Sequence, residues 1–158
     1  MPNKIDDFVA YRVLRLVESR LREVSQALGY NTNPYVTGEW YDAENSDAKH
    51  TLFFEADNGA AVEQFPGSAQ ARSQESVTYK IVGVSKYETE HPRRLAMELE
   101  QDVRTAISRD TADIRAAVGR GCAVRLGSVS YDGGVLAPNK EVGFNLLVTY
   151  TWTQNGDW

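Results

Sequence analysis

The sequence has little of what most secreted and membrane proteins need. A single cysteine, Cys122, among 158 residues excludes an internal disulfide and any zinc site built on cysteine pairs. No apolar run approaches the ~20 residues that a membrane-spanning helix requires. The opening residues, MPNKIDDFVAYRVLR, alternate charged and apolar side chains where a signal peptide needs a continuous hydrophobic region. We therefore expect a protein of the reducing cytoplasm with no membrane association.

Positive charge is also scarce. The chain carries 17 lysines and arginines against 22 aspartates and glutamates, which gives a formal net charge of -5. A dedicated nucleic-acid binder draws its affinity from a basic surface that neutralises phosphates, so this balance argues against one.

Residues suited to catalysis or metal binding are few. His50 and His91 are the only histidines. We expect His50 in a polar loop and His91 beside Pro92 at a helix start, where a capping or surface role is more common than that of a catalytic base. No H-E-x-x-H run is present, and two separated histidines make a weak zinc site. The sequence predicts no catalytic, cofactor-binding or metal-binding residue and no enzymatic activity.

Two acidic patterns fail as ligand sites. The loop DAENSDAKHTLF has Asp47 where a calcium-binding EF-hand loop needs glycine, and Phe53 where it needs a bidentate glutamate. The carboxylates Glu98, Glu100 and Asp102 are interpreted as the solvent-facing side of a helix and not as a glycosidase pair.

Two segments have helical periodicity. From Ile5 to Leu28 apolar residues recur at three- and four-residue steps, which predicts one buried stripe, and Gly29 is suited to end that helix. A second stripe follows Pro92 and continues to Ile107. A short helix is expected at residues 110–119.

Strands are predicted between and after these helices. Residues 57–76 show neither the periodicity of a helix nor that of a strand. We interpret them as a mobile arm that either stays flexible or orders against a neighbour through Phe65 and Arg72. In the strand that starts at Cys122, a β-bulge at Gly127 and Ser128 is needed to keep the apolar residues on one side. The predicted strands are a short one at Tyr35–Thr37 and longer ones at Thr51–Ala56, Ser76–Lys86, Cys122–Asp132 and Val142–Thr153.

The last strand is unusually long. It places large apolar side chains at every second position from Val142 to Trp152, and at ~3.3 Å per residue it spans about 40 Å, twice the usual length. Part of it is expected to project beyond the core. The order of elements predicts one α+β domain over residues 1–158, in which two main helices pack on one face of a single twisted sheet. This sheet is expected to have about four long strands and to be mostly antiparallel or mixed.

The sheet face away from the helices is expected to carry a mixed patch. Val82, Val84 and Leu147 would lie among threonines and Lys80, which is typical of a protein contact surface, although scattered apolar residues are found on any surface. Aromatic residues elsewhere add further candidates. The candidate subunit or partner interface comprises Trp40, Tyr41, Phe65, Arg72, Val82, Val84, Leu147 and Trp152.

Together these features resemble a family. The opening helix ending in ALGY, the aromatic excursion that follows it, the paired strands, the segment YKIVGVSKYETEHPRRLAMELEQDVRTAI and the last strand ending in LLVTYTW are similar to the tail terminator, or tail completion, proteins of long-tailed bacteriophages. The resemblance covers most of the chain and rests on element order and the aromatic-rich final strand. It assigns no role to residues 31–50 or 57–76.

The resemblance implies a non-enzymatic virion component without cofactors, assembled in the bacterial cytoplasm. Such a protein forms a homo-oligomeric ring, expected to be a hexamer, on the head-proximal end of the tail tube. The ring stops tail polymerisation and offers an attachment surface to the head. The implied partners are further copies of the chain, the tail tube protein and a neck or connector protein, while DNA passes through without specific binding. Two other interpretations stay open: another head-tail connector component, or a small ligand-binding or hydrolytic domain.

Overall fold

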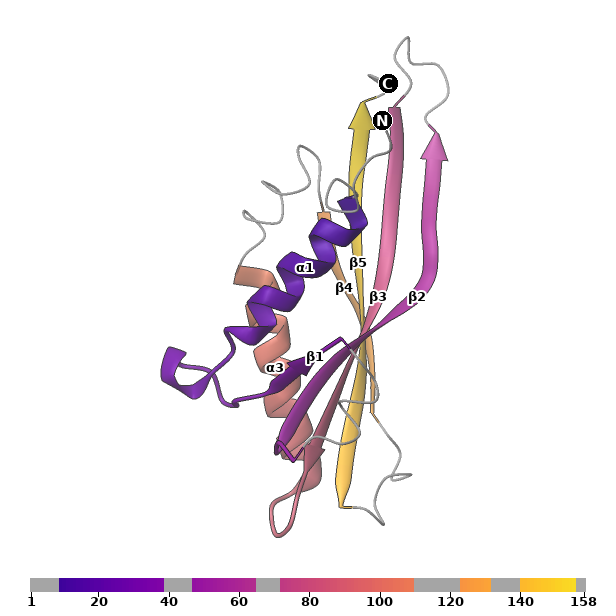
Figure 1. Ribbon diagram of the computed structural model, residues 1–158. Helices are drawn as coiled ribbons and strands as arrows, with labels where there is room; N and C mark the ends of the chain where they lie inside the picture. Colours follow the sequence, from indigo (N-terminus) through magenta and orange to yellow (C-terminus); the bar gives the residue numbers. More distant parts are fainter. Residues whose placement is uncertain (1–8, 39–46, 65–71, 110–122, 132–139, 156–158) are drawn as a thin grey trace.

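The computed structural model describes residues 9–38, 47–64, 72–109, 123–131 and 140–155. They form helices on one mostly antiparallel sheet, so the predicted α+β fold is confirmed (Figure 1). The helices are α1 (Val9–Arg22), the short 3₁₀ helix η2 (Gln26–Leu28) and α3 (Pro92–Arg109). The strands are β1 (Tyr35–Thr37), β2 (His50–Gln64), β3 (Arg72–Lys86), β4 (Ala123–Tyr131) and β5 (Glu141–Asn155).

The sheet contains the four long strands and the short one that were expected. The strand order is β1-β2-β3-β5-β4. β1 runs parallel to β2, and the other three neighbouring pairs are antiparallel. β3 is therefore the central strand, with β2 and β5 on either side of it.

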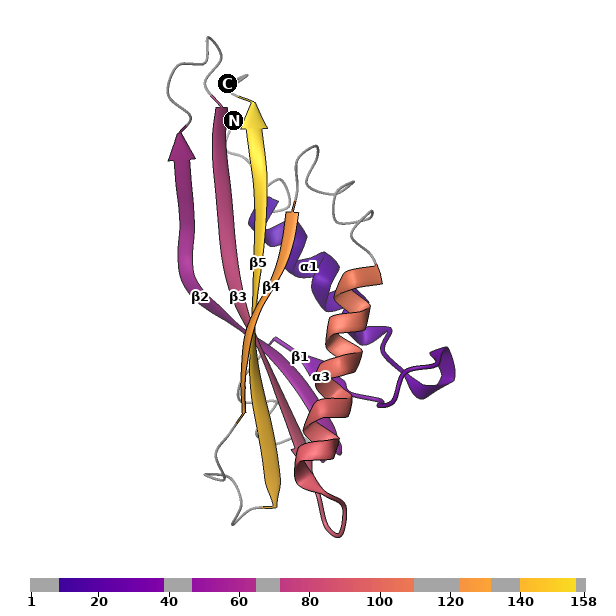
Figure 2. The same cartoon turned by 180° about the vertical axis from the view of Figure 1, so that it is seen from behind.

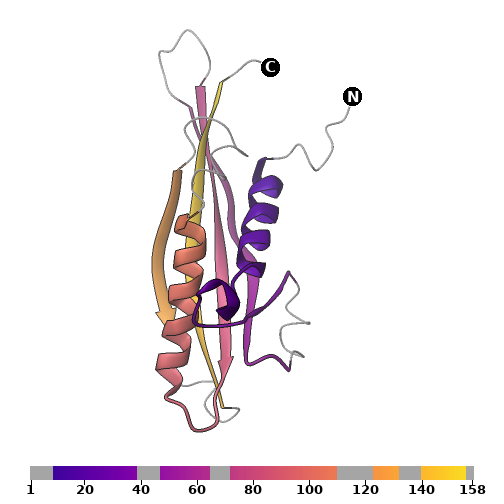
Figure 3. The ribbon, with the colours of Figure 1, turned by 90° about the vertical axis from the view of Figure 1, so that its left-hand side faces the viewer.

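Both α-helices cover the same face of this sheet (Figure 3). Pro92 is the first residue of α3, as predicted from its fixed φ and missing N–H. Neither α1 nor α3, nor any other helix of the described ranges, is long and apolar enough to span a membrane. The predicted stripe of α3 is buried in full: Leu95, Leu99, Val103, Ala106 and Ile107.

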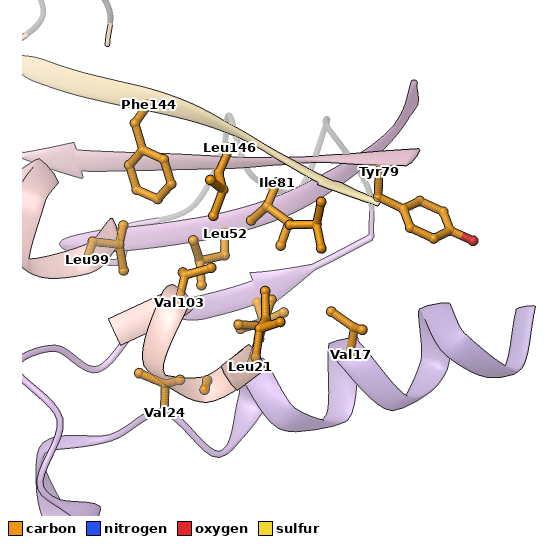
Figure 4. Close-up of a cluster of buried hydrophobic side chains, with 14 of the residues drawn as sticks. Val17, Leu21, Val24, Leu52, Tyr79, Ile81, Leu99, Val103, Phe144 and Leu146 are labelled. Carbon is orange, nitrogen blue, oxygen red and sulfur yellow. The ribbon is translucent and has the colours of Figure 1, made fainter. Parts of the chain in front are cut away.

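The core forms where alternate strand residues meet the helix stripes. Figure 4 shows Phe144, Leu146 and Ile81 pointing from the sheet toward Leu99 and Val103 of α3. The largest fully buried side chains, each under 2% exposed, are Tyr150, Phe53, Phe144, Leu21, Leu52, Ile81, Leu99, Ile107, Leu146, Val13 and Val103.

One glycine makes room for the largest ring at the centre. Gly83 on β3 pairs with Phe144 on β5, and a Cβ atom built on Gly83 would lie 2.3 Å from Phe144 Cε1. The ring therefore occupies the space that a side chain at position 83 would fill.

The prediction for the end of the first helix is wrong. α1 ends at Arg22 instead of continuing to Leu28, because Ser25 adopts an extended backbone with φ -154°. The chain then forms η2, and Gly29 ends that turn in the left-handed conformation with φ 90°. Leu28, expected in the buried stripe, is 63% exposed.

A buried carboxylate ties the segment after η2 to α3. Asp102 is 2% exposed. It accepts hydrogen bonds from the backbone N–H and Nδ2 of Asn31 at 3.0 and 2.9 Å, and from the backbone N–H and Oγ1 of Thr32 at 2.8 and 2.6 Å. Asp102 is thus not on the solvent-facing side predicted for it, because it lies beside the stripe residues Leu99 and Ala106.

Most of residues 57–76 are strand and not the irregular arm that the sequence predicted. β2 continues to Gln64, and it pairs with β3 on both sides of a register shift between Asp57 and Ala61. β5 pairs with β3 as far as Arg72, which lies opposite Asn155. Backbone hydrogen bonds need no particular side chains, so these strands form without an alternating sequence.

The far ends of β2, β3 and β5 project past both helices (Figures 1 and 2). The expectation that the last strand extends beyond the core is therefore confirmed. We call this part, residues 61–64, 72–76 and 151–155, the projecting half of the sheet.

β4 contains the predicted bulge. Its register against β5 shifts between Leu126 and Val129, so that both residues face the helices and pack partly buried against the core. The short helix expected at residues 110–119 and the residue Cys122 lie outside the described ranges.

Candidate subunit interface

The sheet face that the helices leave uncovered holds three aliphatic residues predicted for it. On β3, Val82 and Val84 alternate with the buried Ile81 and so point away from the helices. On β5, Leu147 pairs with Lys80 and points the same way. All three aliphatic side chains are partly buried. We call the following set the open-face patch: Thr78, Lys80, Val82, Val84, Leu147 and Thr149.

The hydroxyl groups of this patch satisfy one another. Thr78 Oγ1 and Thr149 Oγ1 are 2.8 Å apart and share a hydrogen bond across the β3–β5 pair. A protein that covered these two threonines would therefore leave each hydroxyl with one hydrogen-bond partner, which lowers the cost of burying them.

Leu147 is held in place from β4. A Cβ atom on Gly127, at the bulge, would lie 3.2 Å from both the Cβ and the carbonyl oxygen of Leu147. The glycine lets the β4 backbone approach Leu147 closely, so this side chain has a firm support on one side.

One corner of the same face is already buried. Phe53 on β2 pairs with Val82 and lies 1% exposed, and Thr37 and Thr51 beside it are 5% and 3% exposed. The sequence analysis did not predict a buried corner on this side. The accessible part of the patch is therefore centred on Leu147 and not on β2.

The other candidate interface residues are placed only in part. Arg72 and Trp152 lie in the projecting half, where Arg72 pairs with Asn155 and Trp152 with Glu75, and their backbones alone are described. Trp40, Tyr41 and Phe65 lie outside the described ranges. The structure thus places Val82, Val84 and Leu147 on one face of the sheet, and it places Arg72 and Trp152 at the far end of the same two strands.

His50 is not in a polar loop, as the sequence suggested. It is the first residue of β2, is 7% exposed, and its Nδ1 lies 2.7 Å from Ser85 Oγ. Burial, with a smaller effect of the neighbouring Lys49, lowers the pKa of His50. Ser85 is fully buried, so this pair stabilises the β2–β3 contact and does not present a nucleophile to a substrate.

The exposed side of α3 is a second region with ionisable groups. Glu98 pairs with Arg94 at 3.0 Å, and Glu100 pairs with Arg104 at 2.8 Å. Glu100 also accepts a hydrogen bond from the hydroxyl of Tyr131, and burial together with this bond raises the pKa of Tyr131 to about 12. The Tyr131–Glu100 hydrogen bond fastens β4 to α3, while both ion pairs lie within α3.

The shallow hollow on this side of α3 includes His91. Across the ranges that the structure describes, no group of three or more His, Cys, Asp or Glu side chains is arranged to hold a metal ion.

Leu28 is a surface residue that the sequence analysis missed. Large apolar side chains exposed on the described surface are Leu28 at 63%, Met97 at 52% and Tyr35 at 46%. A usable signal was present: Gly29 follows directly, and no charged residue occurs from Val24 to Gly38. Such an uncharged stretch is unusual in a chain of which 25% is charged.

The chain matches no protein-family model and no curated protein sequence.

Proposed function

We propose that this chain is a structural, non-enzymatic protein that forms a closed ring at the head-proximal end of a bacteriophage tail tube. In this role the ring, expected to contain six copies, ends polymerisation of the tail and offers a surface to a neck or connector protein. The observation that carries the proposal is the projecting half of the sheet, where three strands extend past the helices that cover the rest.

A ring requires a contact between different surfaces of neighbouring copies, repeated until it closes. The projecting half supports such a contact because strand ends that leave their own core offer unpaired backbone groups and side chains to a neighbour. The open-face patch supports it as well, since its aliphatic residues are surrounded by hydroxyls that already have partners.

The charge balance suits the proposed role. DNA has to slide through the ring without adhering to it. A chain with a net charge of -5 has weak attraction for phosphates, so passage without specific binding is the expected behaviour.

The proposal is tested by electron microscopy of particles made in a host infected with phage that lack this protein. We expect tails of uncontrolled length, or tails without heads, and restoration of normal particles when the protein is supplied in trans. Normal virions in its absence would overturn the proposal.

A second measurement addresses the ring itself. Light scattering of the purified chain, alone and with isolated tail tubes, reports whether copies associate. We expect a species of about six times the chain mass of 17.6 kDa, either free or bound to tube ends. A chain that stays monomeric at high concentration and does not bind tail tubes would contradict the ring.

A further inference from the structure

The turn at residues 25–33, here called the η2 turn, carries an apolar side chain at its tip. Leu28 is 63% exposed, and its neighbours Gln26, Ala27 and Gly29 are exposed as well. In Figures 1 and 2 the turn, which follows α1 in the chain, extends away from the helices on the side opposite the sheet.

Hydrogen bonds fix the shape of this turn. The backbone N–H of Gln26 donates to Asn33 Oδ1 at 2.8 Å, and Asn33 Nδ2 donates back to Gln26 Oε1 at 3.0 Å. Gln26 Nε2 also donates to the carbonyl of Asn31 at 3.0 Å, and the base of the turn is held by Asp102. A turn held in this way presents Leu28 in one position, so little entropy is lost when a partner covers it.

The η2 turn is free of charge. No charged side chain occurs from Val24 to Gly38, whereas 25% of the whole chain is charged. Interface centres are depleted of charged residues because covering them would strip water from the charge. The lack of any cation excludes phosphate-bearing surfaces as the natural occupant. Met97, the other strongly exposed aliphatic side chain, instead shares its hollow with three arginines.

We propose that Leu28 of one copy packs on the open-face patch of the next copy. The turn and the patch lie on opposite sides of the same chain. A two-fold dimer joins the same surface of both copies, so it does not bring the turn of one copy onto the patch of the other. Copies arranged head to tail join two different surfaces and can do so. The patch offers Val82 and Leu147 as apolar contacts and two threonines that bond each other, and its one charged residue is Lys80. The inference rests on the proposed ring, for which it names the contact that repeats.

Photo-crosslinking of the full chain tests this contact. Benzoylphenylalanine is placed at position 28 in place of Leu28, unlabelled and heavy-isotope-labelled copies are mixed, and the adducts are mapped by mass spectrometry. We expect adducts to residues 78–84 or 145–149 that join labelled and unlabelled copies. The matched control carries the same photo-reactive residue in place of Met97, and we expect no adduct to these segments from it.

Each result decides the question. Adducts confined to one copy, adducts to the η2 turn or helices of another copy, or an absence of adducts would overturn the inference. Should Leu28 crosslink as expected while particles lacking the protein are normal, the contact is correct and the proposed tail function is wrong. Should the ring form with no adduct at the patch, the function stands and the contact is wrong.

A substitution gives an independent measure. Because Leu28 is exposed, Leu28→Asp should leave the thermal unfolding of the single chain unchanged while raising the concentration needed for association by at least about tenfold. Met97→Asp, at a similarly exposed aliphatic position, should change neither quantity. Equal association of both variants with the parent chain would also overturn the contact.

Discussion

Residues 79–84 of β3 and residues 72–76 of the same strand lie in different surroundings. The first group alternates between buried and partly buried side chains, because the helices cover one face of the sheet there. The second group pairs with β2 and β5 on either side but lies beyond the helices (Figure 2). Side-chain burial specifies the first half, while the backbone ladder holds the second. Because α1 and α3 do not reach it, the projecting half is the part of the sheet best suited to be covered by another molecule.

The largest loss of stability should come from replacing Asp102 of α3, which anchors the η2 turn. Asp102→Ala removes the acceptor of four hydrogen bonds and leaves the buried donors of Thr32 and the partly buried donors of Asn31 without this partner. We expect a loss of about 3 to 4 kcal/mol in the free energy of unfolding, measured by urea titration.

The matched control for that variant is Glu98→Ala, one helical turn earlier. Glu98 pairs with Arg94, whose side chain is 79% exposed, so the expected loss is under about 0.5 kcal/mol. Similar losses for the two variants would mean that Asp102 does not anchor the η2 turn.

The next effect concerns packing at the centre of the sheet. Gly83→Ala places a Cβ atom 2.3 Å from Phe144 Cε1, and we expect it to destabilise the protein by about 2 to 3 kcal/mol. Phe144→Leu in the same chain should recover part of this loss, since the smaller side chain vacates the space.

Gly127→Ala provides the comparison for Gly83. Its nearest atoms, in Leu147, are 3.2 Å away, so a shift of a few tenths of an ångström accommodates the methyl group and the expected loss is under about 1 kcal/mol.

A double variant of Gly83 and Phe144 whose loss equals the sum of the single losses would show that the two residues do not compete for space.

A smaller effect should appear with pH. Burial lowers the pKa of His50 below its ordinary value of 6.5, so the unfolded chain binds a proton before the folded chain does. The free energy of unfolding should therefore fall as the pH drops below 6.5. His50→Gln should flatten this slope.

Glu90 does not interfere in that pH window. Its hydrogen bond from Lys49 lowers its pKa to about 2, so its contribution is constant above its unfolded value of 4.5. An unchanged slope in the His50 variant would assign the pH dependence to another group.

The contrast between the halves also explains which features could be predicted from the sequence. α3 was predictable because Pro92 marks its start and the stripe from Leu95 to Ile107 follows one period. The bulge of β4 was predictable because Leu126 and Val129 are out of phase and both must reach the core.

Features that depend on tertiary neighbours were not predictable in this way. The extension of β2 to Gln64 depends on pairing with β3, and the burial of His50 and Asp102 depends on partners 35 and about 70 residues away. For the candidate interface, alternation was enough to place Val82 and Leu147 on the open face. The exposure of Leu28 required knowledge that α1 ends at Arg22.

The lowest free energies of local opening should be those of backbone amides in the projecting half of the sheet. In a dilute, unassembled chain, hydrogen exchange should give opening free energies below about 2 kcal/mol for the amides of residues 61–64 and 73–76, because backbone pairing outside the helix-covered core opens locally. Amides of residues 79–84 and 144–150 should exchange only with global unfolding. On assembly with tail tubes the projecting amides should become protected, since a neighbouring copy then covers them. Projecting amides as slow as those of the core in the dilute chain would show that this half is stable alone, and the structural reason for expecting a neighbour there would be lost.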